Sequence, residues 1–255
     1  MKILAVVVTA ILLAWPHAAS AQIKVLMSGG FSAAYEQLLP EFERTSGIKV
    51  TTGSGASQGT GPQTIGGQLS SGATADVVIL SREGLRGLHE DGRIRAGSES
   101  GLATAPLAAA VRAGSPKPDI GTVEQLKTAL LAAKSISYAD PAKGGASGVY
   151  FAKVIDRLGI AEQMKSKTVL VPGAEAGELV AKGEVEMGVA QASEIAAVPG
   201  AQVVGPLPGD LNSVIVFAVG IGSTSKDPAA ARSLIELLTG PTGSAVLKSK
   251  GMDPA

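Results

Sequence analysis

Short apolar runs alternate along this chain with longer segments in which apolar residues recur at helical spacing. Residues 23–27, 48–52 and 75–80 are aliphatic or β-branched runs of the length typical of strands. Segments 31–44 and 62–71 follow the first two runs and have the spacing of helices. A further helix is expected to open at Ser81. This alternation predicts an α/β protein with parallel strands and crossover helices.

The same pattern continues through the middle and end of the chain. The further predicted strands are 105–111, 135–139, 168–171, 185–190 and 213–219. The further predicted helices are 122–133, 149–158, 178–182 and 228–238, with a helical turn starting at 193. No fixed-period repeat is present, which excludes solenoids and propellers.

Two Gly-rich stretches of low charge, near 101–106 and 205–212, predict two crossings of one hinge. The first lobe would then combine residues 22–104 with 212–255. Residues 105–211 would form the second lobe, inserted between the two parts of the first.

The first 21 residues have the pattern of a secretory signal. Lys2 precedes an apolar run from Ile3 to Trp15, and small residues at 19–21 offer a cleavage site before Gln22. The run is shorter than the ~20 residues that a helix needs to cross a bilayer. We therefore expect a mature, exported protein that starts at Gln22, is located in the periplasm and has no membrane span.

Composition narrows the classes of function. The 255 residues include no cysteine, two histidines and 22 basic against 22 acidic side chains. A cysteine-free chain has no disulfide scaffold, zinc finger or thiol nucleophile. The balanced charge argues against a nucleic-acid partner, because phosphate neutralisation needs a basic surface. Signal removal leaves His89 alone, expected on an exposed helix face, so a histidine triad and a histidine metal site are excluded.

Four loops of small and hydroxyl residues each follow a predicted strand and precede a predicted helix. They are 28–32, 53–61, 144–148 and 172–177. Ligands of open α/β sheets lie at the carboxyl ends of strands, where free N–H groups of helix starts bind anions. The four loops together predict an anion site. The spacing of the second loop does not fit a dinucleotide fingerprint, and no P-loop motif occurs.

Three further residues near these loops have two interpretations each. Arg82 directly follows a buried strand and would either clamp a carboxylate or be a solvated helix-start residue. Lys143 would either face the ligand or lie on the loop surface. Tyr150 would either pack in the core or turn its hydroxyl group toward a cleft.

The motifs that carry a family resemblance run from one end of the mature chain to the other. They are Lys24-Val-Leu-Met-Ser-Gly-Gly-Phe, Phe42-Glu-Arg-Thr-Ser-Gly-Ile-Lys-Val, Gly72-Ala-Thr-Ala-Asp-Val-Val-Ile, Asp140-Pro, Gly148-Val-Tyr-Phe-Ala-Lys and Gly188-Val-Ala-Gln-Ala-Ser-Glu. In this order they resemble the molybdate-binding family of periplasmic solute-binding proteins. The resemblance implies the type II binding-protein fold, in which two α/β lobes close on an anion in a cleft between them.

The resemblance also implies which positions hold the ligand. The family binds its anion with backbone amides and three side chains: a serine in each of the first two loops and a tyrosine after the late strand. Here the first serine position falls on Gly30 with Ser28 nearby, the second on Ser54 or Ser57, and the tyrosine position on Gln191. The family also offers backbone N–H groups at the positions of Ala146, Ser147 and Ala176, and Arg82 and Tyr150 are candidates from the preceding argument. The candidate ligand-binding residues are therefore Ser28, Gly29, Gly30, Ser54, Ser57, Arg82, Ala146, Ser147, Tyr150, Ala176 and Gln191.

Two functions of different class follow from this resemblance. The first is a receptor that captures a small organic carboxylate or polycarboxylate anion for an ABC-type uptake system. The second is an aconitate isomerase, a branch of the same family that moves a double bond by a 1,3-proton shift. Its base would be Glu83, Lys143, Tyr150 or a carboxylate that the sequence does not select. Binding of molybdate or tungstate is a third expectation.

The expected partners follow from the same interpretation. They are a small anionic ligand and, for the receptor, the membrane subunits of an ABC transporter. We expect a monomer without a cofactor or bound metal.

Overall fold

The computed structural model describes residues 22–172 and 175–255. The predicted signal, residues 1–21, lies outside the described residues, as do Gly173 and Ala174 of the fourth loop. No helix in the described ranges has the length and apolar character that crossing a membrane requires.

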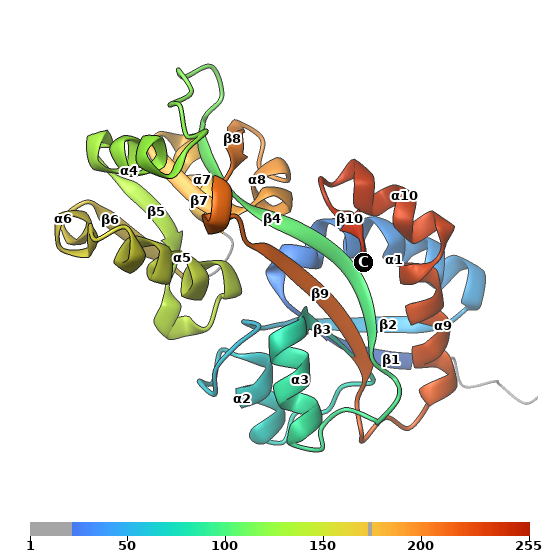
Figure 1. Cartoon of the computed structure of the whole chain (residues 1–255). Helices are drawn as coiled ribbons and strands as arrows, with labels where there is room; N and C mark the ends of the chain where they lie inside the picture. Colours follow the sequence, from blue (N-terminus) through green and yellow to red (C-terminus); the bar gives the residue numbers. More distant parts are fainter. Residues whose placement is uncertain (1–21, 173–174) are drawn as a thin grey trace, which may run out of the picture.

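One curled, mixed sheet runs through both lobes, in the order β2-β1-β3-β9-β4-β7-β5-β6 (Figure 1). β1, β2 and β3 pair in parallel at one end of the sheet, and β5, β6 and β7 pair in parallel at the other. The antiparallel strands β4 and β9 join these two groups. The α/β class and the two-lobed architecture expected from the sequence are confirmed, although the sheet is mixed and not wholly parallel.

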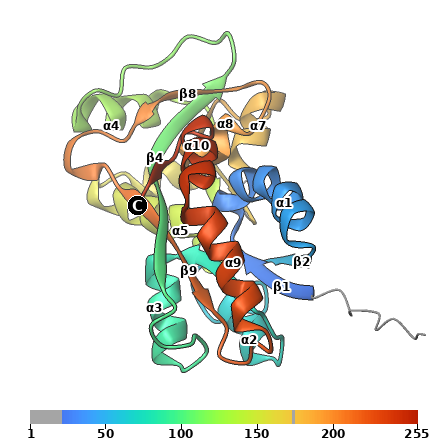
Figure 2. The same cartoon turned by 90° about the vertical axis from the view of Figure 1, so that its right-hand side faces the viewer.

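Lobe 1 is the part built on β1, β2 and β3. Its strands and helices are β1 (Gln22–Met27), η1 (Gly29–Phe31), α1 (Ser32–Ser46), β2 (Lys49–Ser54), α2 (Ile65–Ser70), β3 (Val77–Ser81), α3 (Arg82–Glu90), α9 (Pro228–Thr239), α10 (Pro241–Ser249) and β10 (Asp253–Pro254). Helices α1, α9 and α10 lie together on one side of the sheet (Figure 2).

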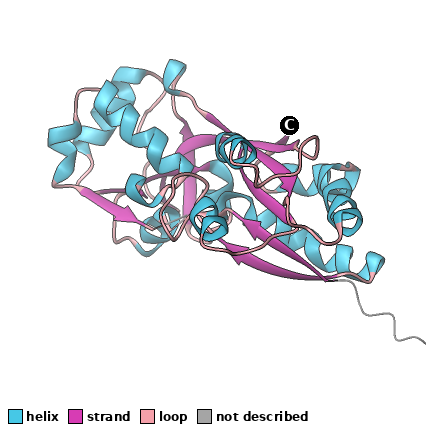
Figure 3. Cartoon of the chain, turned by 90° about the horizontal axis from the view of Figure 1, so that it is seen from below, coloured by secondary structure: helices cyan, strands magenta, loops and turns pink. Residues whose placement is uncertain are grey.

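Lobe 2 is the part built on β5, β6 and β7. Its elements are α4 (Val123–Ala132), β5 (Ile136–Ala139), η2 (Pro141–Lys143), α5 (Ala146–Arg157), α6 (Ala161–Lys165), β6 (Thr168–Val171), α7 (Ala176–Lys182), β7 (Met187–Gln191), α8 (Ala192–Ala196), β8 (Ala201–Pro206) and η3 (Gly209–Leu211). Seen from below, helices surround the strands at both ends of the molecule (Figure 3).

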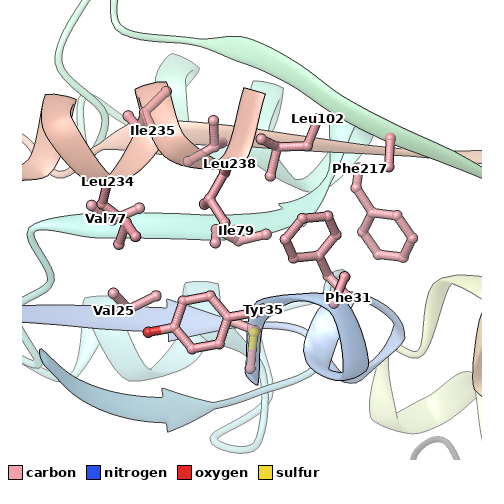
Figure 4. Packing of buried hydrophobic residues seen from close by; sticks show 14 of the residues in the cluster. Val25, Phe31, Tyr35, Val77, Ile79, Leu102, Phe217, Leu234, Ile235 and Leu238 are labelled. Carbon is pink, nitrogen blue, oxygen red and sulfur yellow. The ribbon is translucent and has the colours of Figure 1, made fainter. Parts of the chain in front are cut away.

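The alternation of side chains along the strands fills two cores in lobe 1. Val25 and Ile79 face the cluster beneath α1 and α9, whereas Leu26 and Val78 face the cluster beneath α2 and α3. In the first cluster the Phe31 ring packs against Phe217 with centroids 5.7 Å apart (Figure 4). Each side of the sheet is thus covered by helices. This explains why the sequences of these strands are almost continuously apolar.

The two long strands of the chain connect the lobes. β4 (Ser100–Arg112) pairs with β9 (Val214–Ile221) over its first part, from Ser100 to Pro106. From Leu107 onward it pairs with β7 and β8 of lobe 2. The stretch 101–106, expected as one crossing of the hinge, belongs to this strand, and Pro106 and the residues before it pair with β9.

Other element boundaries also differ from the expectations. α5 begins at Ala146, three residues before the predicted start, because Ala146, Ser147 and Gly148 are buried at its first turn. α6 and β8 were not predicted. Their short apolar patterns do not stand out from loops in the sequence, and packing against neighbouring elements defines them.

Candidate functional site

A cavity of about 390 Å³ lies where the predicted loops of both lobes meet. Its lining comes from the carboxyl ends of β1, β2, β5, β6 and β7 and from the helix starts that follow. The lining residues are Ser28, Gly29, Gly30, Ser54, Gly55, Ala56, Ser57, Gln63, Gln68, Ala139, Gly145, Ala146, Ser147, Pro172, Gln191 and Glu194. The convergence that the sequence predicts for these loops is therefore present.

The first loop presents an unpartnered hydroxyl group. The Ser28 backbone N–H donates to the Ile79 oxygen at 2.9 Å, which fixes the loop to β3. The Ser28 side chain is buried, and its Oγ has no hydrogen-bond partner among the described residues. A buried hydroxyl group without a partner is unfavourable by about 1–3 kcal/mol, so a ligand that supplies the partner gains this free energy.

The second loop is held from both sides. The Gly55 N–H donates to the Met27 oxygen at 3.1 Å, and the Ser81 N–H donates to Ser57 Oγ at 3.3 Å. Ser57 is thus buried, and its hydroxyl group already accepts a hydrogen bond within lobe 1. Ser54, in contrast, is exposed and lines the cavity. Gln68 donates to the Ser54 backbone oxygen at 2.8 Å and completes this wall of the cavity.

Lobe 2 contributes the first turn of α5. Its N-cap is Gly145, which has no side chain, so no side-chain oxygen caps the N–H groups at the start of the helix. Ala146 and Ser147 stand in this turn and line the cavity. Uncapped N–H groups at the positive end of a helix dipole are a general anion-binding feature.

The end of β7 supplies the most unusual part of the lining. Gln191 is buried, and its Oε1 has no hydrogen-bond partner in the described part of the chain. This amide lies so close to Gly30 that a Cβ atom there would overlap Oε1. A glycine at position 30 therefore makes room for a larger polar group from the opposite lobe.

Glu194 lines the same cavity three residues further along, in the first turn of α8. The Gln191 backbone N–H donates to its Oε2 at 3.1 Å. Burial raises the pKa of the Glu194 carboxyl group to about 7, and the Gln191 hydrogen bond opposes this only in part. Glu194 is the only ionisable side chain among the described lining residues.

Three predicted ligand residues lie elsewhere. Arg82 lines a separate cavity with His89 and Glu99, because the chain turns after the buried Ser81 and points the next side chain outward. The Tyr150 hydroxyl group donates to the Leu211 oxygen at 3.3 Å, and the residue packs against the core of lobe 2. Ala176 is buried, and its oxygen accepts a hydrogen bond from Ser137.

Two other expectations concern ionisable residues. Glu83, a candidate base, lines a different cavity, and Lys143 does not line the cavity described above. His89 lies on an exposed helix face against Glu99, as predicted.

The sequence pattern does not select Glu194 as a site residue, because an acidic residue in the first turn of a helix is typical of helix capping. The signal available in the sequence was its place three residues after a strand end that leads into the site.

The chain is similar to several known proteins. A family model described as bacterial extracellular solute-binding protein matches residues 23–253. The chain is 32% identical over 233 residues to an aconitate isomerase from a Pseudomonas species, covering 91% of this chain and 87% of that protein. It is 31% identical over 244 residues to the molybdate-binding protein ModA of Azotobacter vinelandii, covering 92% and 90%.

Solved structures share the fold at lower identity. The periplasmic molybdate-binding protein of Azotobacter vinelandii superposes with a TM-score of 0.74 at 21% identity, covering 90% of this chain and 98% of that one. The sulfate-binding protein SubI of Mycobacterium tuberculosis gives 0.75 at 19% identity, covering 92% and 87%. The family model and the two relatives span nearly the whole described chain. The chain therefore belongs to the family of bacterial extracellular solute-binding proteins.

Proposed function

We propose that this protein captures a small organic polycarboxylate anion between its two lobes, as the periplasmic receptor of an ABC-type uptake system. The observation that carries the proposal is the lining of the cavity: neutral hydrogen-bond donors from both lobes around a volume of about 390 Å³. Such a volume is in the range of about 300–1,000 Å³ typical of sites for organic molecules.

The chemistry of the lining favours a carboxylate over a tetrahedral oxyanion. Ser28 Oγ and the N–H groups at the start of α5 are donors suited to one carboxylate group. Gln191 stands at the position of the family's tyrosine, and its amide offers a donor and an acceptor to a second group. An organic acid of several carboxyl groups can share one proton between a carboxyl group and Glu194, whose pKa of about 7 lies near neutral pH.

Ligand titrations test this proposal. We expect trans-aconitate, citrate and tricarballylate, added to the purified mature protein, to raise the melting temperature and to give saturable heats by calorimetry. Ligand at 100 times its Kd stabilises by about 2.7 kcal/mol, which is a measurable shift. Molybdate, tungstate and sulfate serve as the comparison set. A rise in melting temperature with molybdate or tungstate alone would contradict the proposal.

A second candidate function is the isomerisation of aconitate. Two observations favour it: the relative of that name at 32% identity, and a carboxyl group inside an otherwise neutral cavity. Incubation with trans-aconitate followed by proton NMR tests it, because appearance of the cis isomer above the uncatalysed rate requires an enzyme.

We propose that residues 22–104 with 212–255 move against 105–211 about the long strands β4 and β9, a hinge motion of the kind that closes two-lobed receptors. The pairing of β4 with β9 on one side and with β7 on the other supports this division. Mass spectrometry of the exported protein should show a mature chain that starts at Gln22.

A further inference from the structure

We propose that Glu194 is the base that removes a proton from a CH₂ carbon of a bound unsaturated polycarboxylate and returns it two carbons away. This inference rests on the isomerase form of the proposed function and goes beyond it by naming the group that moves the proton.

The position of Glu194 is the first argument. Among the described lining residues no other side chain can ionise, so no other side chain of the cavity accepts a proton readily near neutral pH. The hydrogen bond from the Gln191 N–H engages Oε2. Oε1 therefore remains available to a ligand, while the bond to Oε2 fixes the orientation of the carboxyl group.

The environment of Glu194 is the second argument. Its neighbours along α8 are apolar or neutral, Ile195 is fully buried, and Ser193 is bonded to the opposite lobe. Burial raises the pKa of this carboxyl group to about 7. A base whose pKa lies near the working pH is ionised often enough to accept a proton and acidic enough to give it back.

The third argument is that the opposite side of the cavity can hold the charge that forms. Removal of a proton from the CH₂ carbon, which itself bears a carboxylate, leaves negative charge that spreads onto this carboxylate. The uncapped N–H groups at the start of α5 and the Ser28 hydroxyl group are donors fixed in place for that carboxylate. Donors held ready for developing charge are an effective way to lower such a barrier.

The reaction balances without a co-reactant. The Glu194 carboxylate takes a proton from the CH₂ carbon of a propene tricarboxylate, and the electron pair of that C–H bond forms a new double bond to the central carbon. The electrons of the old double bond move to the former vinyl carbon. That carbon accepts the proton from the Glu194 carboxylic acid. One C–H bond breaks, another forms, and the enzyme returns to its starting state.

The test compares three proteins with trans-aconitate, in H₂O for rates and in D₂O for exchange of the CH₂ protons. We expect the wild type to form cis-aconitate and Glu194→Gln to be at least about 100-fold slower. The glutamine keeps the acceptor for the Gln191 N–H, so its affinity by calorimetry should stay within about threefold. Glu162→Gln, an exposed glutamate on α6, is the matched control and should retain the wild-type rate.

The outcomes separate this inference from the capture function. A Glu194→Gln protein that isomerises at the wild-type rate overturns the role of Glu194. A wild type that binds trans-aconitate without isomerisation or exchange also overturns it, and leaves capture intact. A wild type that binds no polycarboxylate overturns capture and this inference together. Should Glu194→Gln not fold, Glu194→Asp keeps the charge and should show a reduced rate with a displaced pH profile.

Discussion

The Ser193 hydroxyl group in lobe 2 donates a hydrogen bond of 3.1 Å to the backbone oxygen of Gly30 in lobe 1. A second bond crosses between the lobes, from the Gln58 N–H to the Gly144 oxygen at 2.9 Å. Gly30 lines the cavity, and Gly144 directly precedes the lining residues at the start of α5. The described arrangement is therefore one in which the lobes are in contact, and ligand affinity should depend on these contacts.

Ser193→Ala tests the first contact. It removes the donor and leaves the buried Gly30 oxygen without this bond, which is unfavourable by about 1 kcal/mol in the closed form. We expect ligand affinity, measured by calorimetry, to fall about threefold to tenfold. Ser137→Ala is a matched control, because the buried Ser137 hydroxyl group also donates to a backbone oxygen at 3.1 Å, but within lobe 2. An equal loss of affinity in both variants would show that the Ser193 hydrogen bond has no specific role in holding the lobes together.

Gly144→Ala tests the second contact. Gly144 has φ +80°, and a Cβ atom there would overlap the Gln58 oxygen of the other lobe. We expect more than a tenfold loss of ligand affinity, because the lobes would be held apart. Gly159→Ala is the control for backbone strain, since Gly159 has φ +67° and open space around it. Both variants should lose about 1–2 kcal/mol of unfolding free energy in urea, but Gly159→Ala should bind normally.

Local patterns in the sequence predict most of the strands and helices and the loops that line the cavity, although not α6 and β8. Strands such as 75–80 and the small-residue loops after them carry strong local patterns, and sheet topology brings the carboxyl ends of parallel strands together. These features required no knowledge of contacts between distant residues.

What the sequence does not determine is the direction of single side chains and the contacts between lobes. Arg82 follows β3, whose last residue Ser81 is hydrogen-bonded to Ser57 of the second loop, but the turn after Ser81 takes the arginine to another surface. Glu194 is the opposite case: it would be exposed in an isolated helix, but here it is half-buried because β7 and α8 pack against the first loop of lobe 1. Contacts between residues more than 160 positions apart leave no local pattern.

Stability should depend on pH through Glu194. Its pKa is about 7 in the folded protein, against an ordinary value of 4.5. Between these values the folded protein holds a proton that the unfolded chain has released. This group's contribution to the unfolding free energy is therefore fully present below about pH 4.5 and is lost as pH rises toward 7, by at most about 3 kcal/mol. The measurement is the difference between wild type and Glu194→Gln in urea unfolding at several pH values, which cancels the titration of shared groups. A difference that does not change with pH would contradict a raised pKa.

Arg82→Ala should leave ligand affinity unchanged, within about twofold. From the sequence, this guanidinium group would either clamp a carboxylate, with a loss of about 2 kcal/mol on removal if the charge pair is desolvated, or be a solvated residue at a helix start. In the structure Arg82 is exposed and lines a cavity with His89 and Glu99, separate from the residues around Ser28 and Gln191. Gln191→Ala is the positive control, and its affinity should fall at least tenfold because the truncation removes the amide from the cavity. Calorimetry with the same polycarboxylate measures both variants. If Arg82→Ala weakens binding as much as Gln191→Ala does, the bound form must bring Arg82 to the ligand by a movement larger than closure about β4 and β9, and the cavity described here would be only part of the site.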